Sequence, residues 1–189
     1  MKKRTAPRII AGKFKGKRLK SLPGNQTRPI TDRVKENLFN IIGRDIFDSK
    51  FLDAFAGIGS VGIEAFSRGA QFVQFIEKSQ KPYLILKDNL AEILVSNSVN
   101  LMQADAFRYL SSTVEQEFDY IYIAPPQYKQ MWELAISNID KNPKLLITNG
   151  WIIIQIDPLE YRTVQLDNFI EFDQRKYGST LLVFFNQKN

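Results

Sequence analysis

Residues 51–62 read FLDAFAGIGSVG, and this stretch decides the fold. An apolar run that carries one acidic residue, Asp53, is followed by three glycines, and residues 60–68 then show the apolar spacing of a helix. A parallel strand turns into a helix around a nucleotide-like ligand with this pattern. The stretch therefore predicts an α/β protein with a ligand at the carboxyl end of its first strand.

A second apolar strand runs directly into a proline pair. Residues 120–128 read YIYIAPPQY, so that Pro125 and Pro126 follow the strand at once. Because proline fixes its own φ and donates no N–H, such a loop presents carbonyl oxygens outward. The two strand ends together predict a bound ligand and a reacting group at one edge of a sheet.

Strand and helix patterns alternate along the rest of the chain. We expect strands over residues 51–56, 72–77, 99–105, 120–123 and 151–156, and helices over 31–42, 60–68, 83–94, 106–110 and 131–139. Two last strands, 169–172 and 181–185, flank a turn at Gly178 without a helix between them. This order predicts a parallel sheet with one antiparallel strand near its edge. Right-handed crossovers would bring the ends that carry Asp53, Glu77, Asp105 and Ala124 to one rim.

Composition narrows the chemistry. The chain of 189 residues has the length of one domain, and it contains no Cys and no His. Disulfides, thiolate metal sites and His-based catalysis are excluded, and we expect no metal. No apolar run is long enough to span a bilayer, and the basic start MKKRTAPR precedes no apolar segment of a secretory signal. We therefore expect a cytoplasmic protein, without membrane contact, that acts as a monomer.

Positive charge is concentrated at the start of the chain. Residues 1–35 hold 12 Lys or Arg and one acidic residue, a net of +11, and since the whole chain carries +6 the remainder carries −5. Such a segment is typical of a phosphate-contacting surface, and the alternative is a solvated or disordered tail. The interleaved Ile9, Ile10, Phe14 and Leu19 favour a small hairpin over a tail.

This basic segment defines the predicted organisation. We expect residues 1–30 to form a basic extension and residues 31–189 to form the main domain. The candidate phosphate contacts are Arg8, Lys13, Lys15, Lys17, Arg18, Lys20 and Arg28.

The glycines match G-x-G-x-x-G, which alone is a weak signal. A tight turn without a ligand is one alternative, and a nicotinamide dinucleotide is another, since Glu77 lies 20 residues after Gly57. Asp53 would repel a pyrophosphate, and the residues for hydride chemistry are missing. An acidic rim suits a ligand with hydroxyls, amino groups and a positive centre, and S-adenosylmethionine has all three.

Two acidic residues are candidates for direct ligand contact. Glu77 could accept both ribose hydroxyls through charge-assisted hydrogen bonds, unless it is an ordinary solvent-facing strand end. Asp105 could accept from an adenine amino group, and its alternative is an N-cap for residues 106–110. The two roles of Asp105 are compatible.

The chain resembles the bacterial 16S ribosomal RNA guanine-N2 methyltransferases over nearly its whole length. The matching blocks are RIIAGKFKGKRLK, RPITDRVKENLFNII, LDAFAGIGSVGIEAFSRGA, FIEKS, the Pro-Pro loop and KYGSTLLVFF. The resemblance implies a Rossmann-like, seven-stranded methyltransferase fold, S-adenosylmethionine as donor, and ribosomal RNA or the small ribosomal subunit as partner. It also implies that the Thr-Asp-Arg segment at residues 31–33 folds over the cofactor. The cofactor contacts expected here are Thr31, Arg33, Asp53, Phe55, Gly57, Gly59, Glu77, Lys78, Asp105 and Ala106.

One departure from the family falls on the reacting loop. The family carries an acidic or amide residue before Pro-Pro and an aromatic residue directly after it, whereas this chain has Ala124 and then Gln127 and Tyr128. The lone pair of the guanine amine is delocalised into the ring, and acceptors placed on its N–H groups would orient that lone pair toward the methyl group. The catalytic candidates are therefore Pro125 with its carbonyl, Pro126, Gln127 with its amide, and Tyr128.

Two details of this loop remain open from the sequence. Tyr128 or Tyr122 could stack on a flipped base, or either could pack on a neighbouring helix. The loop itself supports two functions, an active guanine-N2 methyltransferase and an RNA-binding protein of the same fold with weak or no catalysis.

Overall fold

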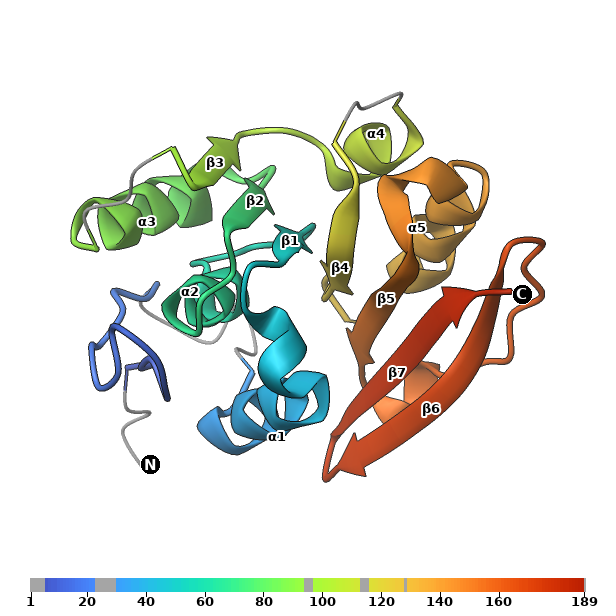
Figure 1. Ribbon diagram of the computed structural model, residues 1–189, viewed down its shortest axis with the longest axis horizontal. Helices are drawn as coiled ribbons and strands as arrows, with labels where there is room; N and C mark the ends of the chain where they lie inside the picture. Colours follow the sequence, from blue (N-terminus) through green and yellow to red (C-terminus); the bar gives the residue numbers. More distant parts are fainter. Residues whose placement is uncertain (1–5, 23–29, 94–96, 113–115, 128, 189) are drawn as a thin grey trace.

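The computed structural model describes residues 6–22, 30–93, 97–112, 116–127 and 129–188. One seven-stranded sheet runs through the molecule, with helices on both faces (Figure 1). The elements in chain order are α1 (Asp32–Ile42), η1 (Gly43–Ile46), β1 (Lys50–Asp53), α2 (Ser60–Ser67), β2 (Phe72–Ile76), α3 (Gln80–Ala91), β3 (Val99–Met102), α4 (Ala106–Ser111), β4 (Phe118–Ile123), α5 (Met131–Asp140), η2 (Pro143–Leu145), β5 (Leu146–Ile156), η3 (Pro158–Glu160), β6 (Phe169–Tyr177) and β7 (Thr180–Gln187).

The strand order is β3-β2-β1-β4-β5-β7-β6. Strands β1 to β5 pair in parallel, and β7 lies antiparallel between β5 and β6. The expected Rossmann-like sheet with a C-terminal antiparallel hairpin is confirmed. Chain order reverses between β1 and β4, and open α/β sheets bind their ligands at such a switch point.

Alternating side chains of the strands fill two cores, one on each face of the sheet. Phe51 and Phe75 point to the face that α1, α2 and α3 cover. Leu52 and Ile121 point to the other face, where α4 and α5 bring Leu110 and Trp132. Burial on both faces explains why the central strands read as nearly continuous apolar runs.

Several element boundaries differ from those expected. β1 ends at Asp53 and β3 at Met102, each three residues early, because the chain leaves the ladder to form the loops of the rim. β5 begins at Leu146, five residues before the expected start, and β6 continues to Tyr177. Most of the added residues are polar, and Thr148, Asn149, Gln174, Arg175 and Lys176 are exposed, so these segments show no continuous apolar strand pattern.

The described part of the basic start is folded against the main body. Ile9 and Gly16–Lys17 exchange backbone hydrogen bonds, and Arg8 and Arg18 form one antiparallel bridge, which makes the expected small hairpin. Ile9 and Leu19 are buried in the same core as α1 and α2. No helix within the described residues is both long and apolar enough to cross a membrane.

Candidate active site at the carboxyl rim of the sheet

A tight loop connects β1 to α2. Gly59 adopts φ +84°, and a Cβ atom there would stand 2.2 Å from the Leu86 side chain. A Cβ atom on Gly62 would stand 2.3 Å from the ring of Phe75 on β2. A Cβ on Gly57, by contrast, would meet nothing within 4 Å. The glycines let α2 approach the sheet closely and leave open space at the start of the loop, as a cofactor requires.

The side chain of Asp53, the last residue of β1, is hydrogen-bonded to the start of α2 behind this loop. Its buried carboxylate accepts a hydrogen bond from the backbone N–H of Gly62 at 3.0 Å. Burial raises the pKa of Asp53 to about 7, and the nearby charge of Glu77 adds to the rise. The site therefore holds a carboxyl group that a positive ligand would help to ionise.

Glu77 follows β2 and faces the same loop. Its carboxylate accepts from the N–H of Gly57 at 2.8 Å and from the N–H of Ser79 at 2.6 Å. A carboxylate has about four acceptor positions, so capacity remains for the hydroxyls of a ribose. Glu77 is more than a solvent-facing strand end, because its carboxylate also binds the N–H of Gly57 at the start of the glycine loop.

Asp105 is the N-cap of α4, which is one of the two roles predicted for it. One carboxylate oxygen accepts from the N–H groups of Phe107 and Arg108, and the other pairs with Lys78 at 2.9 Å. The hydrogen bond from Lys78 lowers the pKa of Asp105. Ala106 opens the helix, and Phe55 meets the ring of Phe107 edge-on at 5.5 Å. The predicted contacts Phe55, Lys78, Asp105 and Ala106 are thus neighbours.

Thr31 and Arg33 lie at the start of α1. The Thr31 hydroxyl caps the helix by accepting from the N–H of Val34 at 3.3 Å, and Arg33 is exposed in the first turn. Lys35 on the same helix donates to Ser60, the first residue of α2. α1 is therefore joined to the glycine loop, although no described contact links Thr31 or Arg33 to it directly.

The Pro-Pro loop follows β4 beside this site. Register pairs Asp53 with Tyr122, which brings the residues after β1 and β4 side by side. Pro125 is buried and Pro126 is exposed, while Ala124 and Gln127 are half-buried. Tyr128 lies outside the described residues. Two strand ends that are 70 residues apart in sequence thus form one rim.

Tyr122 is not available to a base, so of its two alternatives only packing in the protein interior remains. The residue is 2% exposed in the core, and its hydroxyl donates to Gln155 at 2.6 Å. Strand alternation turns it into the α1 side of the sheet.

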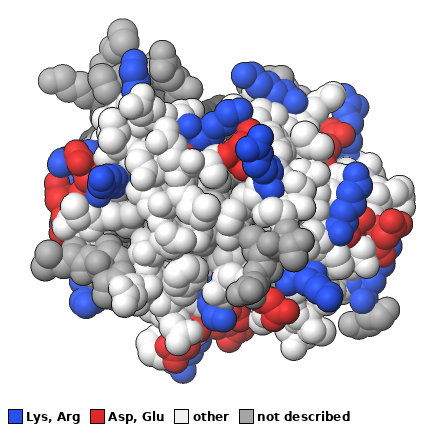
Figure 2. Space-filling model, turned by 90° about the horizontal axis from the view of Figure 1, so that it is seen from above, with Lys and Arg blue, Asp and Glu red and all other residues white. Residues whose placement is uncertain are grey.

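The basic hairpin carries two kinds of cation. Arg8 pairs with Asp32 at 2.8 Å, Lys17 with Glu92 at 3.6 Å, and Lys20 with Glu92 at 3.1 Å and Asp88 at 3.5 Å. Lys13, Lys15 and Arg18 are exposed, and no acidic side chain of the described residues pairs with them. Figure 2 shows positive side chains in small groups, several beside acidic ones, on the face drawn there. Arg28 lies outside the described residues.

Sequence reasoning missed three buried polar residues near the glycine loop: Lys35, Glu64 and Asn89. Ser60, Glu64 and Arg68 recur at intervals of four on the predicted helix, and this polar stripe was a usable signal for Glu64. No comparable signal marked Lys35 or Asn89, which lie among other polar residues.

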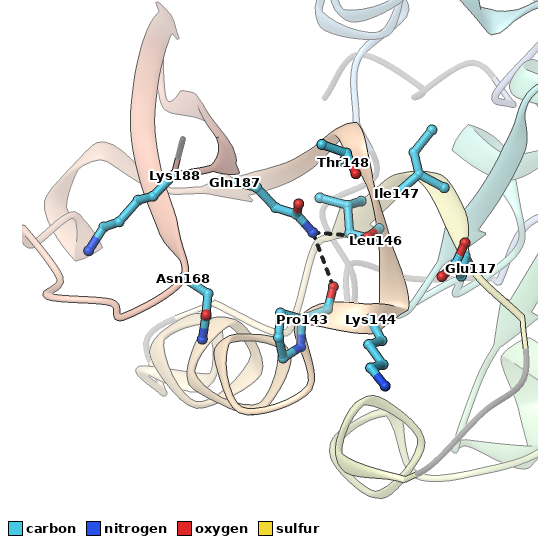
Figure 3. Close-up of a pocket in the computed structure, with 9 residues that line it drawn as sticks. All are labelled: Glu117, Pro143, Lys144, Leu146, Ile147, Thr148, Asn168, Gln187 and Lys188. Carbon is cyan, nitrogen blue, oxygen red and sulfur yellow. Dashed lines mark hydrogen bonds between the residues drawn. The ribbon is translucent and has the colours of Figure 1, made fainter.

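A separate hollow of about 430 Å³ lies at the amino-terminal ends of β4 and β5, opposite the carboxyl rim (Figure 3). Its lining includes Glu117, just before β4, and Leu146, the first residue of β5, while Gln187 donates to Pro143 and Leu146. Because β4 and β5 run away from it, this hollow is remote from the glycine loop.

Comparison with known proteins agrees with this geometry. Residues 7–186 match the family described as "Conserved hypothetical protein 95". The chain is 31% identical over 183 residues to "Putative rRNA methyltransferase YlbH" of Bacillus subtilis, which covers 96% of this chain and 99% of that protein. It is 37% identical over 147 residues to "Ribosomal RNA small subunit methyltransferase D" of Haemophilus influenzae, covering 77% and 72%. The solved structure of "putative methylase HI0767" from Haemophilus influenzae superposes with a TM-score of 0.80 at 30% identity, covering 96% and 98%.

Proposed function

The chain belongs to the family described as "Conserved hypothetical protein 95", and on this premise we propose that it is an S-adenosylmethionine-dependent methyltransferase of ribosomal RNA. Its target in this proposal is the exocyclic N2 amine of a guanine in the small-subunit RNA. Relatives that carry the name of small-subunit rRNA methyltransferases support the substrate class. The position on the base rests on the resemblance of the quoted sequence blocks to the guanine-N2 methyltransferases alone.

One observation carries the proposal. The glycine loop after β1, Glu77 after β2 and the Pro-Pro loop after β4 share the rim at the switch point of the sheet. Glu77 would accept hydroxyls of the ribose, and Asp53 would face the positive part of the ligand. Open space at Gly57 and the spare acceptor positions of Glu77 fit such a cofactor.

The cofactor supplies an electrophilic methyl group, and the chain has to orient the amine that accepts it. The Pro125 carbonyl and the Gln127 amide oxygen would accept the two N–H groups of guanine and turn the nitrogen lone pair toward the methyl group. Ala124 contributes no side-chain acceptor. Gln127 is half-buried beside the exposed Pro126, and its side-chain amide oxygen is the second acceptor in this proposal.

RNA would be held by the basic hairpin. Among the described cations of the hairpin, Lys13, Lys15 and Arg18 are those that no described carboxylate pairs with, so they would contribute most of its phosphate contacts. We keep residues 1–30 as a proposed RNA-binding extension and residues 31–189 as the proposed methyltransferase domain. Residues 7–20 nevertheless share a core with that domain.

A second candidate function follows from Ala124. Without the side-chain acceptor of its family, the protein would bind cofactor and RNA but transfer methyl groups slowly or not at all. Incubation with labelled S-adenosylmethionine and small ribosomal subunits or their RNA separates the two functions, and digestion to nucleosides then identifies N2-methylguanosine. Binding of both partners without transfer favours the second function, and absence of cofactor binding refutes both.

A further inference from the structure

Three polar side chains that the proposed reaction does not use are buried between the basic hairpin and the glycine loop. Lys35 is 1% exposed, Glu64 0% and Asn89 1%. A buried charge costs several kcal/mol unless it is paired and hydrogen-bonded, and apolar residues of similar volume often serve stability equally well. The contacts of these three residues therefore indicate what their burial achieves.

Glu64 binds the first half of the hairpin. Its two carboxylate oxygens accept the N–H groups of Ile10 at 2.8 Å and Ala11 at 3.0 Å. They also pair with Arg68 at 2.8 Å and with Lys35 at 3.4 Å. Since Glu64 lies one helical turn after the start of α2, the hairpin is fixed to the helix that the glycine loop begins.

Lys35 extends this connection to the loop itself. Its ammonium donates to the carbonyl of Arg8 at 2.7 Å, and to the carbonyl and hydroxyl of Ser60 at 3.4 and 3.3 Å. One charged group therefore touches the hairpin and the residue directly after Gly59.

Asn89 makes the same connection from the other half of the hairpin. Its amide oxygen accepts from the N–H of Lys20 at 2.8 Å, and its amide nitrogen donates to the carbonyls of Lys20 at 3.2 Å and Ile58 at 3.0 Å. All polar atoms of this side chain are used, and Ile58 lies inside the glycine loop.

We propose that Lys35, Glu64 and Asn89 are positioning residues that hold the basic hairpin, residues 7–20, in fixed register with the glycine loop, residues 57–60. RNA phosphates bound by the hairpin then stand at a set distance from the cofactor. A hairpin that is already ordered loses little conformational freedom when RNA binds. It therefore binds RNA more tightly than a mobile hairpin of the same sequence would. This inference rests on the proposed function for the identity of the partner, but the mechanical connection does not.

Two variants with matched controls test the proposal. Asn89→Leu removes the hydrogen bonds of the Asn89 amide to Lys20 and Ile58. Asn138→Leu is its control, because the Asn138 amide also donates to a backbone carbonyl, that of Phe107. Glu64→Gln removes the buried charge, and Asp140→Asn is its control. Asp140 also accepts two backbone N–H groups with its two oxygens, those of Asp167 and Asn168, but on the other face of the molecule.

Hydrogen exchange reads the connection without RNA. In the native protein, S-adenosylhomocysteine should slow exchange at the amides of Ile10, Ala11 and Lys20, because the loop that it orders holds the hairpin. Asn89→Leu and Glu64→Gln should speed exchange at these amides and abolish the effect of the ligand, while the controls keep it. A ligand effect that persists in both variants, or that is missing from the native protein although the ligand binds, overturns the proposal.

RNA affinity reads the consequence. We expect Asn89→Leu and Glu64→Gln to weaken binding of small-subunit RNA about 5- to 20-fold, with the matched controls near native affinity at a comparable drop in melting temperature. Equal weakening in the controls would show a general loss of stability and refute positioning. If the native protein binds no RNA, the proposed function fails, and the exchange experiment decides the fate of the connection separately.

Discussion

At the scale of single residues, Glu77 has two tasks. Its carboxylate holds the N–H groups of Gly57 and Ser79 and would also accept the ribose of the cofactor. Glu77→Ala should therefore weaken S-adenosylhomocysteine binding by about 1.5–3 kcal/mol, or roughly 10- to 100-fold. Glu77→Gln keeps one acceptor but loses the charge, so its affinity for S-adenosylhomocysteine should lie between those of the native protein and Glu77→Ala. Isothermal titration calorimetry measures both, and native affinity in Glu77→Ala would exclude this residue from the site.

Asp53 makes stability and cofactor binding depend on pH. Its folded pKa of about 7 exceeds the ordinary value of 3.8 because the carboxyl is buried. Between these values the folded state binds the extra proton, so stability falls as pH rises through this window and levels off above it. Asp53→Asn keeps an acceptor for Gly62 and should gain about 1–3 kcal/mol over the native protein at pH 8. Urea denaturation at pH 5 and pH 8 measures the difference.

The same carboxyl predicts a trend for the ligand. A positively charged cofactor favours ionised Asp53, so affinity should rise as pH rises through about 7 in the native protein. Asp53→Asn should bind more weakly at pH 8 and show a flatter profile. An equally steep profile in that variant would assign the pH dependence to another group.

Ala124 is expected to limit the rate of methyl transfer. A missing preorganised acceptor typically costs about 10²–10³ in rate. We expect Ala124→Asn and Ala124→Asp to accelerate single-turnover transfer to small-subunit RNA without tightening cofactor binding. Gln127→Ala should slow whatever transfer the native protein performs. If Ala124→Asn slows a native enzyme that is already fast, and Gln127→Ala has no effect, backbone carbonyls alone orient the amine.

At the scale of elements, the basic hairpin should not act as a uniform positive surface. Replacing Lys13, Lys15 and Arg18 by Ala removes three unpaired charges and should lower the slope of log affinity against log salt by about 2. Replacing Arg8, Lys17 and Lys20 removes the same net charge, but these residues are paired with Asp32, Asp88 and Glu92. The second triple variant should change the slope less. Fluorescence anisotropy with a small-subunit RNA fragment compares them, and equal slopes would contradict the division into paired and unpaired cations.

At the scale of the whole molecule, the hairpin is part of one folded unit. Ile9 and Leu19 belong to the core of α1 and α2, and the carboxylate of Glu64 depends on hairpin N–H groups. Removing residues 1–20 should therefore cost more than the roughly 2–5 kcal/mol of one large core truncation, and the protein should melt well below the native temperature. A truncated protein with native stability would show that the hairpin is only appended.

Much of the site could be predicted because its signals are local. The glycines after β1, the acid after β2, the cap at Asp105 and the helix start at Thr31 are each written within a few residues of the chain. The order of strand and helix patterns was sufficient for the parallel sheet, because handedness and connection rules leave few topologies. The start of β5 and the end of β6 were not predicted, because these residues are in the sheet through pairing with a neighbouring strand and do not show apolar alternation.

The sequence by itself determined the fold class, the rim and the candidate cofactor residues. Only the tertiary structure decided that Tyr122 points into the core, that three of the basic residues are already paired, and that Glu64 holds residues 10 and 11. These facts depend on partners 24 to 75 positions apart. A pairing at that distance is set by how helices and strands pack together, and no local pattern in the chain records it.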